Sequence, residues 1–252
     1  MIQLSVVIIT YNEERNIGRC LDSVKEIADE ILIVDSFSTD KTLDICKSYG
    51  AKIIQHSFEG HIQQKNYALS KTAFSHVLSL DADEAISDPL KTSILAIKSD
   101  WQGDGYDVNR LTNYCGVWIR HGGWYPDWKL RLFDKQKGKW TGLNPHDRYE
   151  FDEKTPRIRR ISGDILHYSY YSISDHLRQV DYFTDISATT LFHKNRKASL
   201  IRLLVSPPFR LFRDYILKSG WLDGYYGFVI CLISSYAVFI KYAKLRELYR
   251  RK

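Results

Sequence analysis

The feature that most constrains the fold is a regular alternation of apolar runs and amphipathic segments over the first hundred residues. Runs rich in Val, Ile and Leu at residues 4–10, 30–35, 52–55 and 76–81 predict buried strands. The segments at residues 16–27, 40–50, 61–72 and 88–99 have helical spacing. Strands that are apolar throughout and alternate with helices are typical of a parallel sheet covered on both faces. The sequence therefore predicts an open α/β domain.

The composition changes after residue 105. Residues 106–170 are rich in Trp, Tyr, Gly and Arg, and their short β-like runs indicate a mixed extension of the sheet. A helix is expected at residues 172–194, a break at the prolines of residues 205–211, and a basic helix after them. We expect one domain at residues 1–190, with halves at 1–105 and 106–170, and a helical tail at residues 191–252.

Three acids, Asp81, Asp83 and Glu84, stand at the end of the apolar run at residues 76–81. Mg²⁺ in proteins is held by one or two carboxylates together with substrate phosphates, so two carboxylates at this spacing predict a divalent cation site. The alternative is a polar turn in which Asp88 caps the next helix. Ligands of open α/β sheets bind outside the carboxyl ends of the strands, which favours a binding role.

Polar residues also stand at the ends of the other predicted strands. Thr10, Tyr11 and Glu13 lie at the end of the first run, and Asp35 ends the second. The next helix begins near residue 40, where backbone N–H groups can hold a nucleotide. An ordinary helix cap is the alternative for this stretch.

Four blocks in order, "SVVIITYNEERNIGRCLDSV", "ILIVDSFSTDKT", "QQKNYAL" and "LSLDADE", resemble the nucleotide-binding half of the inverting family-2 glycosyltransferases, which have the GT-A fold. The likeness covers residues 1 to about 170. It is closest to the bacterial branch that adds sugars to the lipopolysaccharide core, including core β-1,4-glucosyltransferases. Many members carry two adjacent acids where this chain has Asp35 and Ser36, so one usual contact is absent.

This resemblance implies a site for a nucleotide-diphosphate sugar, with UDP as the expected nucleotide. The residues implied for that ligand are Thr10, Tyr11, Glu13, Asp35, Lys65, Asp81, Ala82 and Arg131. Asp83 would hold the metal, Mg²⁺ or Mn²⁺. His167 would be a further metal ligand, although a lone His beside an apolar run is more often a packed or surface residue. Lys65, taken alone, is equally a solvated helix lysine.

Transfer with inversion also needs a general base near the acceptor hydroxyl. Relatives place an acid after a His at the position of His146, so Asp147 is the first candidate and Glu150 the second; a plain hairpin turn is the alternative. This chain has Asp where relatives often have Glu. Aromatic residues that could stack on an acceptor sugar or fill the core are Trp124, Tyr125, Trp128 and Trp140.

The positive charge of the chain is concentrated at its C-terminal end. Residues 190–252 hold 13 Lys and Arg against 3 acids, a net of +10, whereas residues 1–189 hold 23 against 27, a net of −4. The seventeen residues between Asp223 and Lys241 carry no charge, which is short for a spanning helix. We expect a peripheral hairpin on an anionic membrane surface, and not a nucleic-acid site. A helical pair buried against the domain or in a homodimer is the alternative.

Together these features predict a metal-dependent inverting glycosyltransferase that acts on a lipid-linked saccharide, in synthesis of the lipopolysaccharide core or another envelope glycan. Its expected place is peripheral, at the cytoplasmic face of the bacterial inner membrane. Two alternatives stay open: a polyprenyl-phosphate acceptor, which needs no base, and a membrane-bound nucleotide-binding scaffold without catalysis.

Overall fold

The computed structural model describes residues 1–143 and 146–251. They form two compact units: Met1–Arg110 with Asp127–Tyr168, and Leu111–Pro126 with the chain from Ser169 onward. These bounds differ from the expected boundary at residue 190. The reason is that Tyr114 and Ile119 pack against Ile230 of the C-terminal region, so residues 111–126 belong with the tail.

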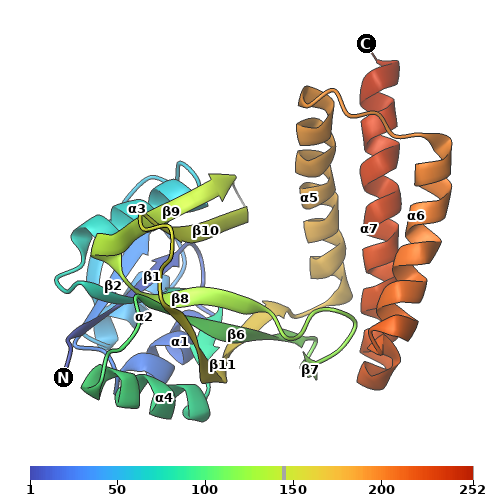
Figure 1. Ribbon diagram of the computed structural model, residues 1–252. Coiled ribbons are helices and arrows are strands. Elements are labelled where there is room, and N and C mark those ends of the chain that lie inside the picture. The colour runs from blue at the N-terminus through green and yellow to red at the C-terminus, as the bar shows by residue number, and fades with distance from the viewer. Residues whose placement is uncertain (144–145, 252) are drawn as a thin grey trace. The chain divides into compact units, whose positions relative to one another are not determined.

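The first unit contains the predicted parallel sheet (Figure 1). Its strands are β1 (Leu4–Thr10), β2 (Glu30–Asp35), β3 (Lys52–Gln55) and β4 (His76–Asp81), in the order β3-β2-β1-β4. The helices between and after them are α1 (Ile17–Val24), α2 (Thr42–Ser48), α3 (His61–Lys71) and α4 (Asp88–Ser99). The structure confirms each of these predicted elements to within a few residues.

Side chains from alternate positions of β1 fill two cores, one on each face of the sheet. Leu4, Val6 and Ile8 pack with apolar residues of α1, α2 and α4. Val7 points to the other face and packs with Ala68 and Leu69 of α3 and with Phe133, Trp140 and Tyr149. Both faces are therefore covered, as a sheet of uniformly apolar strands requires.

The expected mixed extension is confirmed. The sheet continues from β4 through β8 (Trp128–Asp134), β6 (Gly105–Tyr114), β11 (Ile158–Tyr170) and β5 (Glu84–Ile86), with β7 (Val117–Ile119) paired to β6. β8 is antiparallel to β4. The short η1 (Lys135–Lys137) leads into an antiparallel hairpin of β9 (Gly138–Leu143) and β10 (His146–Phe151). β6 and β11 each run from one unit into the other.

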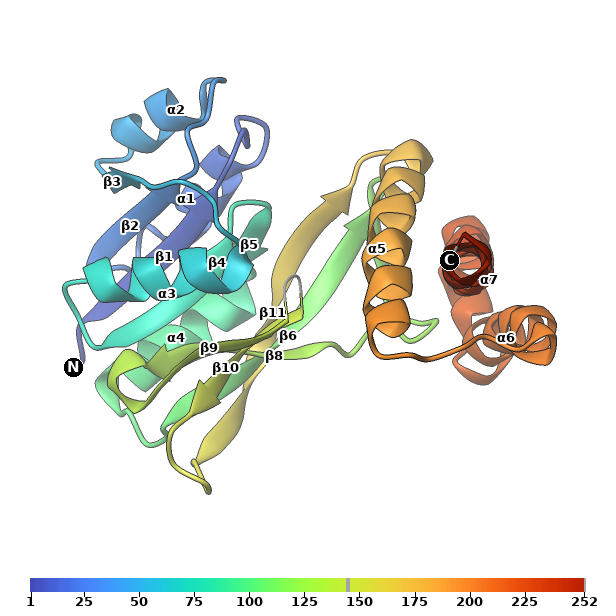
Figure 2. The ribbon, with the colours of Figure 1, turned by 90° about the horizontal axis from the view of Figure 1, so that it is seen from above.

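The second unit is mainly helical. It contains α5 (Ile173–His193), α6 (Leu200–Phe212), the π-helix η2 (Arg213–Leu217), the 3₁₀-helix η3 (Gly220–Asp223) and α7 (Gly224–Arg250). α7 lies between α5 and α6 (Figure 2). The segment Gly220–Arg250 is long and apolar enough to cross a membrane by length and composition, and 28% of its most apolar window is buried.

The expected break at the prolines is wrong. α6 runs through Pro207 and Pro208, and the interruption falls earlier, where Ser199 caps α6 by accepting a hydrogen bond from the Arg202 N–H at 3.1 Å. α6 packs along α7, where the Ser235 hydroxyl donates to the Pro207 carbonyl at 2.7 Å. Tertiary contacts here outweigh the helix-breaking tendency of proline.

Candidate active site

The carboxyl ends of three parallel strands bring the predicted polar residues together in the first unit. In the strand register, Thr10 of β1 lies beside Asp35 of β2, and Ile9 lies beside Asp81 of β4. A parallel sheet places these ends at one edge, which is where ligands of open α/β sheets bind. The expectation that these segments share one edge is therefore confirmed.

The loops after β1 and β2 are tied to each other by hydrogen bonds. The Asn12 N–H donates to the Ser38 hydroxyl at 2.8 Å, and the Thr39 N–H donates to the Asn12 side-chain oxygen at 2.8 Å. Asp35 is fully buried and accepts from the Ser38 N–H at 3.0 Å and the Gln55 amide at 3.2 Å. Asp35 thus orders the loop after β2.

Two side chains at the end of β1 are available to a ligand. The Thr10 hydroxyl is buried and has no hydrogen-bond partner among residues 1–143 and 146–251. Tyr11 is 59% exposed. Glu13 accepts a hydrogen bond from the Asn16 amide at 2.7 Å, and burial together with the nearby Asp83 raises the pKa of Glu13. A buried hydroxyl without a partner is costly, and a bound ligand would satisfy it.

Asp81 is held between two positive groups. Its carboxylate lies 3.2 Å from the Lys65 ammonium of α3 and 3.0 Å from the Arg131 guanidinium of β8. Burial by itself would raise the pKa of Asp81, but Lys65 and Arg131 outweigh it and hold that pKa well below its usual range. Lys65 and Arg131 are both almost fully buried. Their charges offset much of the repulsion within the acidic cluster.

Glu84 is part of the same ion network. Its side chain is buried, accepts from the Asp81 N–H at 2.9 Å and lies 2.9 Å from Arg131. Arg110 approaches Glu84 to 3.8 Å. This geometry gives Glu84 a role in stabilising the turn after β4. Arg110 was not predicted, because its approach to Glu84 depends on the order β8-β6-β11-β5 of the mixed part of the sheet.

Asp83 and His167 lie side by side, with Oδ2 of Asp83 and Nε2 of His167 3.1 Å apart. The Tyr168 N–H donates to the Asp83 carbonyl at 2.9 Å, which fixes the acidic turn against β11. Burial lowers the pKa of His167, but the Asp83 carboxylate more than compensates and raises it. Among the described residues no three His, Cys, Asp or Glu side chains are grouped to hold a metal. One carboxylate and one imidazole fit a cation that is shared with ligand phosphates.

The two base candidates lie on different faces of the hairpin formed by β9 and β10. Asp147 is directed toward α3, where its carboxylate is 2.8 Å from the Lys65 ammonium. Glu150 is an odd number of residues further along β10, so its side chain points to the opposite face. There it is 44% exposed and pairs with Arg148 at 2.5 Å. The structure therefore brings Asp147 to the site and leaves Glu150 away from it.

The aromatic residues do not form one platform. Trp140 is 4% exposed, belongs to the core and lies under the Lys65 ammonium, 4.7 Å from the ring centroid. Trp124 packs in the second unit with Tyr114 and Tyr170. Ala82 is buried in the turn between Asp81 and Asp83. A contact that sequence reasoning missed is the Arg19 guanidinium of α1, stacked 3.7 Å from the Tyr168 ring.

Comparison with known proteins agrees with this geometry. The profile described as Glycosyl transferase family 2 matches residues 5–152, more than half of the chain. An uncharacterized glycosyltransferase of Rickettsia typhi is 32% identical over 98% of this chain and 88% of its own length. The lipopolysaccharide core biosynthesis glycosyltransferase LpsC of Rhizobium meliloti is 25% identical over 97% of this chain and 92% of its own.

A crystal structure of S. aureus TarS 1–349 shares the fold. Its TM-score is 0.50 at 16% identity, over 99% of this chain and 91% of that one. The GT-A fold expected from the four sequence blocks is confirmed.

Proposed function

The chain belongs to glycosyl transferase family 2, and from this premise we propose that its carboxyl-edge site transfers a sugar from a nucleotide-diphosphate sugar to a lipid-linked saccharide, with inversion. The chain is a glycosyltransferase. The observation that carries the finer proposal is the set of charges around Asp81, Asp83 and Lys65 at this edge. Different side chains there can bind a cation, bind a diphosphate and take the proton from the hydroxyl group of the acceptor.

The proposed donor site uses the loops after β1 and β2. Thr10, Tyr11 and Glu13 would line the nucleotide, and Asp35 would hold the loop that closes beside it. Lys65 would approach a phosphate when a donor enters. Arg131 is buried against Asp81 and Glu84, so it would act by positioning Asp81. UDP is the nucleotide we propose.

The proposed metal ligands are Asp83 and His167. A bound Mg²⁺ or Mn²⁺ would supply positive charge to the departing diphosphate. The chain's own contribution is to hold the two ligands together, because β11 pairs with β5 and the Tyr168 N–H fixes the Asp83 carbonyl. Asp81, already neutralised by Lys65 and Arg131, would instead contact ribose or sugar.

Asp147 is the proposed general base. The contact with Lys65 fixes the direction of the Asp147 side chain, and a carboxylate held within reach of the acceptor hydroxyl can accept its proton. Glu150 is exposed on the other face of the hairpin and takes no part in this proposal. Placing the acceptor hydroxyl against Asp147 would make the reaction depend on orientation and electrostatics.

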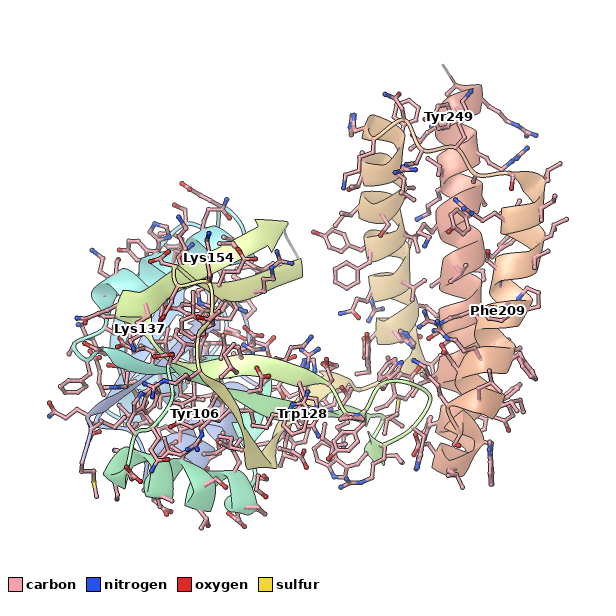
Figure 3. All side chains as sticks on the ribbon, in the orientation of Figure 1. Tyr106, Trp128, Lys137, Lys154, Phe209 and Tyr249 are labelled. Atoms are coloured by element: carbon pink, nitrogen blue, oxygen red, sulfur yellow. The ribbon has the colours of Figure 1, made fainter. Side chains whose placement is uncertain are left out.

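The acceptor that we propose is a saccharide of the lipopolysaccharide core, supported by the likeness to LpsC along almost the whole chain. The second unit supports a membrane-bound acceptor. On the face of α6 that is turned away from α7, large apolar residues are more than half exposed: Leu200, Ile201, Leu204, Val205, Phe209 and Phe212. Phe209 is labelled in Figure 3. This exposed apolar face and the net charge of +10 fit a peripheral place on the cytoplasmic membrane face.

A second candidate is transfer to a polyprenyl phosphate. The observation that favours it is the close pairing of Asp147 with Lys65, which gives Asp147 an ionic role apart from proton transfer. An acceptor that is already an anion needs no base. Substitution of Asp147, discussed below, separates the two candidates.

The deciding experiment replaces Asp83 by Asn and measures sugar transfer from UDP-sugars to membrane extracts, with and without Mn²⁺ or Mg²⁺. We expect activity to fall at least about a hundredfold, because one of the two metal ligands is lost. The matched control is Asp88→Asn, an acid five residues further on whose side chain is 97% exposed. Metal-dependent transfer by the Asp83 variant at the wild-type rate would refute the metal role.

A further inference from the structure

A group of positive side chains in the second unit has no part in the chemistry proposed above. It consists of Arg120, in the loop that follows β7, and Lys218, which follows η2. The side chains of Arg120 and Lys218 are exposed, and neither forms an ion pair within the described part of the chain. Exposed cations without acidic partners are available to an anion.

Lys218 lies directly on this loop. Its carbonyl accepts a hydrogen bond from the Gly122 N–H at 3.0 Å. Its side chain occupies the space above Gly123, where an added Cβ would lie 2.6 Å from the Lys218 Nζ. Gly122 and Gly123 have φ values of +66° and +82°, a conformation that glycine adopts without strain. The glycines therefore allow the ammonium group to sit against the loop backbone.

A buried acid fixes the orientation of His121. The Asp223 carboxylate is 6% exposed; it accepts from the His121 N–H at 2.7 Å and from the ring Nδ1 at 2.8 Å. It also accepts from the Arg120 N–H at 3.1 Å. An ionised carboxylate only accepts, so Nδ1 carries the hydrogen of this contact, which holds the His121 ring in the loop. The Asp223 carboxylate therefore has its hydrogen-bond donors within the loop and is directed away from solvent.

The neighbouring acid is also neutralised internally. Asp214 is 1% exposed and pairs with Arg210 and Arg213. Neither Asp214 nor Asp223 therefore presents a free carboxylate beside Arg120, His121 and Lys218. The loop keeps a net positive charge toward solvent.

Large apolar side chains stand next to the positive group along the chain. Leu217, Trp221, Leu222 and Tyr225 are each more than half exposed, and they flank Lys218 and Asp223. Trp and Tyr beside Lys and Arg are typical of the boundary between lipid headgroups and acyl chains. A soluble phosphate would need the positive groups but would leave these apolar side chains in water.

We propose that Arg120 and Lys218 bind the phosphate of a lipid headgroup while Trp221, Leu222 and Tyr225 enter the adjoining apolar layer. This proposal rests on the membrane association proposed above, and not on the chemistry of sugar transfer. Arg120 and Lys218 supply charged hydrogen-bond donors from two side chains, which suits a phosphate with several acceptor oxygens.

The test is flotation of the full chain with vesicles of phosphatidylcholine that contain a minor share of phosphatidic acid. We expect Arg120→Gln combined with Lys218→Gln to weaken vesicle binding about tenfold or more, because two positive groups at the headgroup are lost. The matched control is Lys197→Gln combined with Arg250→Gln, which removes one Lys and one Arg from exposed positions at the other end of the unit. We expect the control to bind nearly as the wild type does.

Two further arms identify the source of the phosphate. Vesicles with the same share of oleic acid carry negative charge without the phosphate monoester, and we expect weaker binding to them. Inorganic phosphate alone should protect the chain only weakly in a thermal-shift assay. Three results would each overturn the proposal. They are an equal loss of vesicle binding in both double variants, equal binding to the oleic acid vesicles, and displacement of the vesicles by low concentrations of inorganic phosphate.

Folding and activity are followed separately. The substituted side chains are exposed, so the melting curve followed by circular dichroism should match that of the wild type. Transfer to a soluble acceptor saccharide in detergent should also be unchanged. Loss of vesicle binding with retained transfer supports the lipid site, and loss of transfer in the Asp83 variant with retained vesicle binding concerns only the active site.

Discussion

Lys65 joins two parts of the active site at the scale of single residues. It lies 3.2 Å from Asp81 at the end of β4 and 2.8 Å from Asp147 on β10. A donor phosphate would attract the same ammonium group. Binding of the donor would therefore weaken the hold of Lys65 on Asp147 and leave that carboxylate to the acceptor, which fits an ordered reaction in which the donor binds first.

Substitution of the two hairpin acids tests the base. We expect Asp147→Asn to lower the transfer rate about a hundredfold to ten-thousandfold on a saccharide acceptor, the range for loss of a general base. Glu150→Gln is the matched control and should stay close to wild type, since Glu150 is exposed and faces away. An Asp147→Asn variant that keeps full activity on a polyprenyl phosphate would favour the second candidate function.

His176 predicts a pH dependence of stability. Its ring is 4% exposed and contacts the Tyr114 hydroxyl at 3.1 Å, and burial lowers the pKa of His176 to about 4. The unfolded chain takes up the proton near pH 6.5, so this stabilisation is fully present above that pH and is lost as the pH falls toward about 4. At about pH 5 the loss should be about 2 kcal/mol.

Urea unfolding measured at neutral pH and at about pH 5 checks this prediction. His176→Gln keeps a neutral polar group beside Tyr114 but cannot take up a proton. The free energy of unfolding of the variant should therefore fall less between the two pH values than that of the wild type. Equal falls would show that His176 is not the group responsible.

The sequence predicted which candidate residues share one edge where parallel strands decide their place. Thr10, Asp35 and Asp81 end strands that a simple pattern identifies, so their common edge follows from the fold class. Arg110 and the burial of Glu84 depend on which antiparallel strand pairs with which. No local pattern in the sequence specifies that pairing.

At the scale of elements, the start of α7 packs closely against η3 because Gly227 has no side chain. A Cβ on Gly227 would overlap the carbonyl oxygen of Gly220 and lie 2.9 Å from the Cβ of Asp223. Gly227→Ala should therefore destabilise the second unit by about 1–3 kcal/mol, as overpacking does. Gly18→Ala in α1 is the control, because its Cβ would meet Ile45 at 3.7 Å, an ordinary contact. Thermal unfolding of both variants measures the difference.

The parallel strands and the helices within residues 4–99 were predicted to within a few residues, because their hydrophobic pattern is regular. The cap of α4 differs: Ser87, and not Asp88, accepts the hydrogen bond from the Leu90 N–H. α6 was predicted poorly: Pro207 and Pro208 suggested a break, yet packing against α7 holds the helix together. Local rules fail where a contact with a distant segment supplies the missing stabilisation.

At the scale of the whole molecule, the chain passes between its two units three times, near residues 110, 126 and 168. This arrangement could not be predicted, because the composition of residues 111–126 resembles that of the rest of the mixed sheet. Only the structure shows that apolar side chains of this segment, Tyr114 and Ile119, pack against Ile230 of α7.

This threading means that the two units cannot be separated by one cut. A fragment ending at residue 168 would still carry residues 111–126 but would lack the helices that cover Tyr114 and Ile119. In such a fragment the apolar side chains of Tyr114 and Ile119 would lose this cover and would be exposed to water. A soluble enzyme without the C-terminal helices would therefore need apolar residues replaced within residues 111–126, in addition to a shorter chain.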